Sequence, residues 1–222
     1  MTSIYQRPPA YHVMEIELAA THEAGHAVMQ WFVGLELGAM EMTAEGANAS
    51  KASTCCPRVP LVTLSDLRKR VLVLLAGNAV TLERWPDSWN DAGDWRDVLS
   101  ALREHHKLDT IAWTINDGNT PLERFLKHRE PHKREVDNRK TDNPKANAAL
   151  QDAMVRCREI FAHPPIREAV GKVAAAFLAA PRGDGGLVQL EGREAVEICE
   201  AVVGQEFRIT NPWSAWIAGE AQ

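Results

Sequence analysis

The sequence THEAGHAVM, residues 21–29, lies in a segment whose pattern predicts a helix over residues 14–32. Apolar side chains recur there at helical spacing, and no proline interrupts the run. Gly34 follows at the position where a helix of this length is expected to end. The two histidines of the quoted stretch are therefore expected on the surface of one helix.

The spacing of these histidines is typical of a metal site. Residues in a helix advance by about 100° each, so His22 and His26 lie on one face, one turn apart. Both imidazoles can then reach one zinc ion at about 2.0–2.1 Å. Glu23 points about 100° away, where its carboxylate suits a general base better than a ligand. Gly25 is costly inside a helix, which suggests that another backbone passes close to it.

The alternative is an ordinary helix that carries an HExxH pattern by chance. A catalytic zinc usually has three protein ligands and one open position, so a third ligand is needed. The HExxHxxGxxH pattern fails, because Met29 and Phe32 stand where its glycine and its last histidine would be. Spacing alone leaves five carboxylates open: Glu83, Asp87, Asp91, Asp94 and Asp97.

Four strings carry a resemblance to a known family: HEAGHAV (22–28), LLAGNAVTLE (74–83), DAGDWRDVLSAL (91–102) and LVQLEGREAVEI (187–198). In this order they resemble the peptidase domain of FtsH-type ATP-dependent zinc metalloproteases. The resemblance implies a Zn²⁺ cofactor with His22, His26 and Asp94 as ligands. It also implies Glu23 as the catalytic base.

The sequence departs from that family at several positions. Asn78 replaces an arginine and Thr81 a glutamate in the second string, and Asn90 stands where a glycine is usual before the third ligand. None of these is a ligand, although Asp91 competes with Asp94 for the third position. The GxxxxGK[ST] phosphate loop of an ATPase is not found in this sequence. We therefore expect a peptidase that acts on flexible segments, or one that works with a separate unfoldase or adaptor.

The fold class expected is mainly α, with at most a very small β element near the zinc helix. A peptidase core is expected over residues 1–126, a polar loop or linker over 127–145, and a helical part packed on the same domain over 146–222. Further helices are expected from Ser65 as N-cap and over residues 94–106, 149–161, 166–180 and 192–203, with a less regular continuation over 111–125. Residues 39–43 are expected to form a brief strand followed by a loop, and its edge could bind an extended peptide.

The net charge, the length of the apolar runs and the cysteine spacing argue against several classes of protein. The net charge of −5 argues against a nucleic-acid partner, which would require clustered Lys and Arg. The apolar run of residues 71–80 falls far short of the roughly 20 residues that span a bilayer, so no membrane anchor is expected. The four cysteines lack CxxC spacing, so we expect reduced thiols. Prolines interrupt the start of the sequence, where a signal peptide would need an unbroken apolar segment, so we expect a cytoplasmic protein.

The sequence thus predicts a zinc-dependent metalloendopeptidase that hydrolyses peptide bonds in flexible or unfolded protein segments. The alternative is a non-catalytic binding or regulatory module, derived from a peptidase fold and stabilised by zinc.

Overall fold

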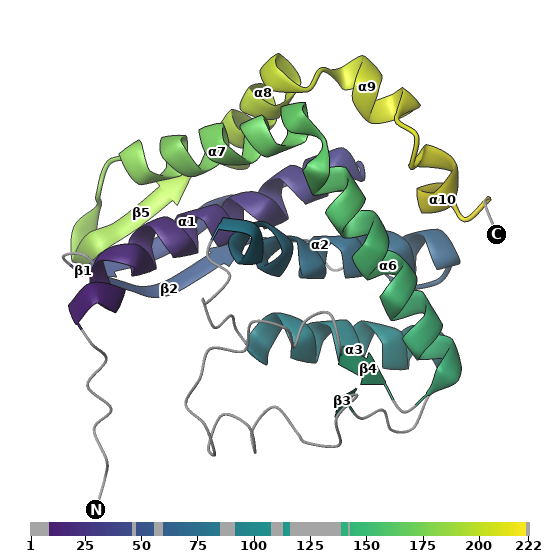
Figure 1. Cartoon of the computed structure of the whole chain (residues 1–222). Coiled ribbons are helices and arrows are strands. Elements are labelled where there is room, and N and C mark those ends of the chain that lie inside the picture. The colour runs from purple at the N-terminus through teal and green to yellow at the C-terminus, as the bar shows by residue number, and fades with distance from the viewer. Residues whose placement is uncertain are drawn as a thin grey trace, which may run out of the picture.

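The computed structural model describes residues 9–45, 48–55, 60–84, 92–107, 113–115, 139–141 and 143–220. The protein is mainly α, with a small three-stranded antiparallel sheet. Figure 1 shows helices α7, α1, α2 and α3 lying one below another, with α6 crossing beside them. The helices are α1 (Pro9–Phe32), α2 (Leu64–Arg84), α3 (Ala92–His106), α6 (Pro144–Ala162), α7 (Pro164–Ala179), α8 (Gly192–Val202), α9 (Gln205–Thr210) and α10 (Ser214–Ala218).

Helices α1 and α2 form the centre of the core. The expected helix is confirmed, although α1 begins five residues earlier than the pattern indicated, and Gly34 follows it with a φ of 74°. A Cβ on Gly25 would lie 2.9 Å from the Ala76 carbonyl oxygen and 2.7 Å from Val80 Cγ2. The expectation that another backbone passes close to Gly25 is therefore confirmed, and that backbone is α2.

The sheet is larger than the sequence indicated. The expected brief strand is β1 (Met40–Glu45), but β2 (Asn48–Thr54) follows it where a loop was expected, and β5 (Leu187–Leu190) pairs on its other side. Both pairings are antiparallel, with Met40 opposite Thr54 and opposite Leu190. The expectation that residues 39–43 offer a strand edge is wrong, because β1 is the central strand and β2 and β5 are the outer ones.

Helices α7 and α8 lie within two residues of their expected ranges, whereas α6 begins five residues earlier than expected and α9 and α10 were not predicted. Helices α6 and α7 meet at His163, and both begin with prolines, whose fixed φ suits the first helical turn. Asn143 caps α6 by accepting hydrogen bonds from the backbone N–H groups of Lys145 and Ala146. Helix α8 ends within a residue of the expected position.

The segment between α3 and α6 differs from expectation where it is described. Trp113–Ile115 forms β3 instead of a helical continuation, and it pairs antiparallel with β4 (Arg139–Thr141), which lies within the expected linker. The greater part of the expected linker, residues 127–138, lies outside the described residues, as do residues 85–91.

The N-cap of α2 is Thr63 and not Ser65. The Thr63 hydroxyl accepts from the Asp66 backbone N–H at 3.1 Å, while Asp66 Oδ2 accepts from the Thr63 backbone N–H at 2.8 Å. This reciprocal pair is a capping box with aspartate in the acidic position. The bond from the Thr63 backbone N–H, reinforced by one from its hydroxyl, lowers the pKa of Asp66 below its ordinary value of 3.8.

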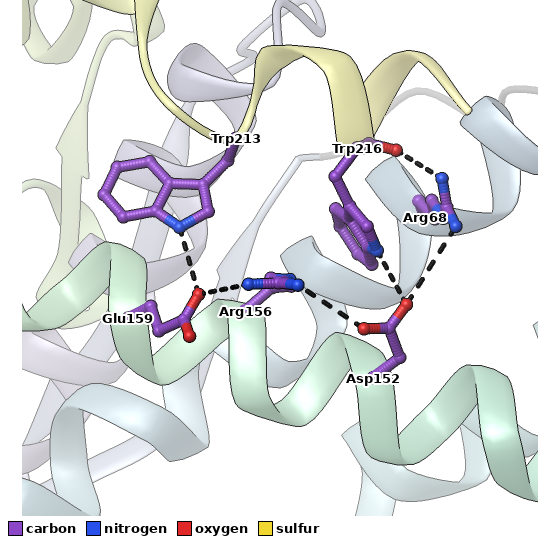
Figure 2. Close-up of polar contacts among 6 residues, drawn as sticks. All are labelled: Arg68, Asp152, Arg156, Glu159, Trp213 and Trp216. Atoms are coloured by element: carbon purple, nitrogen blue, oxygen red, sulfur yellow. Dashed lines mark hydrogen bonds and ion pairs between the residues drawn. The ribbon is translucent and has the colours of Figure 1, made fainter. Parts of the chain in front are cut away.

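The C-terminal segment is fastened to α2 and α6 by two tryptophans (Figure 2). Trp216 Nε1 donates to Asp152 Oδ2 at 2.6 Å, and the Arg68 guanidinium lies 4.5 Å from the centre of the Trp216 ring. Trp213 Nε1 donates to Glu159, which also pairs with Arg156. The last helix therefore contacts the first turns of α2. The same helix, α2, also contacts the two histidines.

The described helices include none with the length and the apolar character needed to cross a membrane.

Candidate metal centre

The two histidines of the HExxH sequence face each other as the helical spacing predicted. Their Nε2 atoms lie 3.0 Å apart, and their rings meet edge to face with centroids 4.7 Å apart. Two nitrogens that each lie about 2.0–2.1 Å from a tetrahedral zinc are about 3.3 Å from each other. The observed separation of the two Nε2 atoms is thus close to the one that a shared zinc requires.

The backbone of α2 sets the orientation and the tautomer of His26. His26 Nδ1 lies 2.7 Å from the Val73 carbonyl oxygen, and both groups are buried. A carbonyl oxygen only accepts, so Nδ1 must carry the proton, and the Nε2 lone pair of the neutral ring then faces His22. Zinc-binding histidines commonly have such a backbone partner on the second nitrogen.

Gly77 keeps the space beside the two imidazoles open. A Cβ at this position would lie 2.5 Å from His22 Nε2 and 2.6 Å from His26 Nε2. A methyl group would therefore lie against both Nε2 atoms, where a shared ion would have to be. The short distance between the two Nε2 atoms, the fixed orientation of His26 and the lack of a side chain at Gly77 are compatible with a shared zinc ion.

Glu23 is buried, and a residue of the sheet donates a hydrogen bond to its side chain. Its side chain is 6% exposed, and its Oε2 accepts a hydrogen bond of 2.7 Å from the Thr54 hydroxyl at the end of β2. The same hydroxyl oxygen lies 3.1 Å from the Glu23 backbone carbonyl. The expected base is thus in a fixed position next to the first histidine in the sequence.

The third ligand is not determined by the described residues. The backbone of Asp94 lies in the first turn of α3, which packs against α2, but its side chain is outside the described part. The same holds for the side chain of Glu83 and for all of Asp87 and Asp91. Asp97 is exposed. Within the described part of the chain, no cluster of three His, Cys, Asp or Glu side chains is arranged to hold a metal.

The two departures from the family pattern in α2 are buried. Asn78 is 1% exposed, and the fully buried Thr81 donates its hydroxyl to the Gly77 carbonyl at 2.8 Å. This bond lies within the helix turn that faces the histidines. Both side chains are neutral, and neutral groups are cheaper to bury than charged ones.

Sequence reasoning missed three contributors to the site. Val73 acts through its carbonyl group, and no side-chain pattern can reveal that contact. Gly77 did have a signal in the sequence, because a glycine inside an apolar helix indicates a close approach of another group. Thr54 gave no signal, because β2 itself was expected to be a loop.

Comparisons with known proteins give no match for this chain, either among protein-family models or among curated sequences.

Proposed function

We propose that the protein is a zinc-dependent metalloendopeptidase. The observation that carries the proposal is the 3.0 Å distance between the Nε2 atoms of His22 and His26. His26 is held in this position because its Nδ1–H donates a hydrogen bond to the Val73 carbonyl oxygen. The resemblance to the FtsH-type peptidase domain points in the same direction. In that assignment His22, His26 and Asp94 hold the zinc, and Asp91 is the competing third ligand.

The chemistry divides between the ion and the protein. Zinc, when bound, acts as a Lewis acid that polarises the scissile carbonyl and lowers the pKa of a water molecule. Glu23 takes a proton from the attacking water and delivers it to the leaving amine nitrogen. The hydrogen bond from His26 Nδ1 to the Val73 carbonyl oxygen fixes the orientation in which this imidazole would bind the ion.

An extended peptide suits the geometry of the sheet. β2 is an outer strand, and its last residue, Thr54, touches the expected base. A peptide that adds to an outer strand gains main-chain hydrogen bonds without any particular sequence. A flexible or unfolded segment can adopt this extended form unaided, so the proposed substrates are such segments, with delivery by a separate unfoldase or adaptor for folded proteins.

The test is cleavage of unfolded casein together with metal analysis, for the wild type and for Glu23→Gln. We expect the wild type to cleave casein and a chelator to abolish cleavage reversibly. Glu23→Gln should retain zinc and lose about 100-fold or more in rate, the scale of a general base. Equal activity of the two proteins would reject the role of Glu23.

The second candidate is the zinc-stabilised binding module. The buried neutral residues Asn78 and Thr81 favour it, because the family that the sequence resembles has charged residues there. This candidate predicts that both proteins hold zinc, that both are inert on every flexible substrate, and that zinc removal lowers the melting temperature.

A further inference from the structure

The side chain of Thr54 connects the outer strand of the sheet to the expected base. Thr54 is the last residue of β2, opposite Met40 in the central strand. Its hydroxyl lies 2.7 Å from Glu23 Oε2. Among the described residues no other group hydrogen-bonds to the Glu23 carboxylate, although the side chain is 6% exposed. A buried carboxylate with so few partners depends strongly on the one it has.

The contact restricts which carboxylate oxygen can accept a proton. The Thr54 hydroxyl has one hydrogen, and at 2.7 Å the carboxylate oxygen is a better acceptor than the Glu23 backbone carbonyl at 3.1 Å. Glu23 Oε2 already accepts one hydrogen bond, so Oε1 is the oxygen better placed to accept a proton from the attacking water.

We infer that Thr54 is a positioning residue of the proposed peptidase, which orients the Glu23 carboxylate so that Oε1 takes the proton from the attacking water. This inference rests on the proposed function. It also links substrate binding to the orientation of the base, because the strand that would pair with an extended substrate ends in the residue that orients Glu23.

The test replaces the hydroxyl without changing the shape of the side chain. Thr54→Val keeps the β-branch that suits a strand and removes the hydrogen bond, whereas Thr54→Ser keeps the bond. For casein-derived peptides, Thr54→Val should lower kcat by about 10- to 100-fold, the scale of a misplaced catalytic group, and leave KM within about 2-fold. Thr54→Ser should restore kcat to within about 3-fold of the wild type.

The matched control is Ser53→Val, which removes an exposed hydroxyl from the neighbouring residue of the same strand. Its kcat should fall far less than that of Thr54→Val. A fall as large as that of Thr54→Val would attribute the effect to the strand as a whole and overturn the inference.

A measurement on the zinc-free protein tests the contact without any activity. With glutamate labelled by ¹³C at the carboxyl carbon, the Glu23 signal is identified by its absence from Glu23→Gln. At constant pH this signal should shift in Thr54→Val and stay in place in Thr54→Ser and Ser53→Val. An unmoved signal in Thr54→Val would overturn the inference, even if that variant is too unstable for kinetics.

The outcomes separate the inference from the proposed function. If the wild type is active and Thr54→Val has an unchanged kcat, the positioning role is wrong and the peptidase assignment stands. If the wild type is inert with zinc bound, the peptidase assignment fails, whatever the carbon spectra show.

Discussion

The imidazole of His26 and the carbonyl of Val73, 47 residues apart in sequence, form a buried hydrogen bond of 2.7 Å. This bond joins the HExxH helix to the central helix of the core, and it directs the His26 Nε2 lone pair towards His22. The geometry of the candidate metal centre is thus a consequence of how α1 packs on α2.

Substitution of Gly77 by alanine is expected to disrupt the centre. The new Cβ would lie 2.5–2.6 Å from the Nε2 atoms of both histidines, which is closer than Cβ contacts allow. One or both rings must move, so we expect zinc affinity to fall by about 10-fold or more. Zinc titration followed by a chromophoric chelator measures this change.

Gly171→Ala is the matched control for that substitution. Gly171 lies in α7, is exposed, and has nothing within 4 Å of an added Cβ. Alanine is the better helix former, so this variant should gain about 0.5–1 kcal/mol in the free energy of unfolding and keep the zinc affinity of the wild type. Unchanged affinity in Gly77→Ala would contradict the proposed position of the ion.

Thr63→Ala should lower the free energy of unfolding by about 1 kcal/mol, because the variant loses the N-cap of α2. The folded-state pKa of Asp66 is lowered, so its bond to Thr63 stabilises the protein above about pH 4 and loses this effect as the pH falls through the folded-state pKa. Urea unfolding at pH 7 and at lower pH measures the difference. Ser65→Ala should change stability by less than about 0.5 kcal/mol, and a reversed order would contradict the capping box.

Alkylation of native protein should separate the described cysteines. Cys55 is exposed, whereas Cys157 and Cys199 are buried. Burial raises the pKa of Cys157 far above its ordinary value and, with Glu200 nearby, that of Cys199 to about 12. At pH 8 only about one Cys199 in 10,000 is then a thiolate. Mass spectrometry after iodoacetamide should find Cys55 modified, and equal modification of all three would contradict this packing.

Trp216→Phe should lower the free energy of unfolding, although the phenyl ring still fills most of the space of the indole. The ring still covers Arg68, but the Nε1 donor to Asp152 is lost, which costs about 1.5–3 kcal/mol for a bond to a charged group. Since Asp152 is partly exposed, we expect the lower end of that range. Urea unfolding measures the loss, and Trp213→Phe, whose partner Glu159 keeps its bond to Arg156, should cost less.

The sequence predicted most reliably the features that depend on residue spacing within a single helix. Helical periodicity predicted α1, α2 and α3 and the juxtaposition of His22 and His26, because the spacing within a helix fixes which residues share a face. The prediction for α2 began at the wrong cap, because Ser65 and Thr63 are both favoured cap residues and only the Asp66 contact distinguishes them.

Contacts between distant segments were less predictable. Strand β2 has the sequence NASKAST, whose small and polar residues lack the apolar alternation of a strand, and its stability comes from pairing with β1. The bonds from Thr54 to Glu23 and from His26 to Val73 depend on that pairing and on helix packing. The third ligand remains a prediction, since the side chain of Asp94 lies outside the described residues.

X-ray absorption at the zinc edge of the zinc-loaded protein tests the central claim most directly. We predict one zinc per chain, with a first shell of nitrogen and oxygen at about 2.0–2.1 Å and the multiple-scattering signature of two imidazoles, which His26→Ala reduces to one. Protein that retains no zinc after dialysis would contradict the account. So would a sulfur shell at about 2.3 Å, which would place the metal on the cysteines.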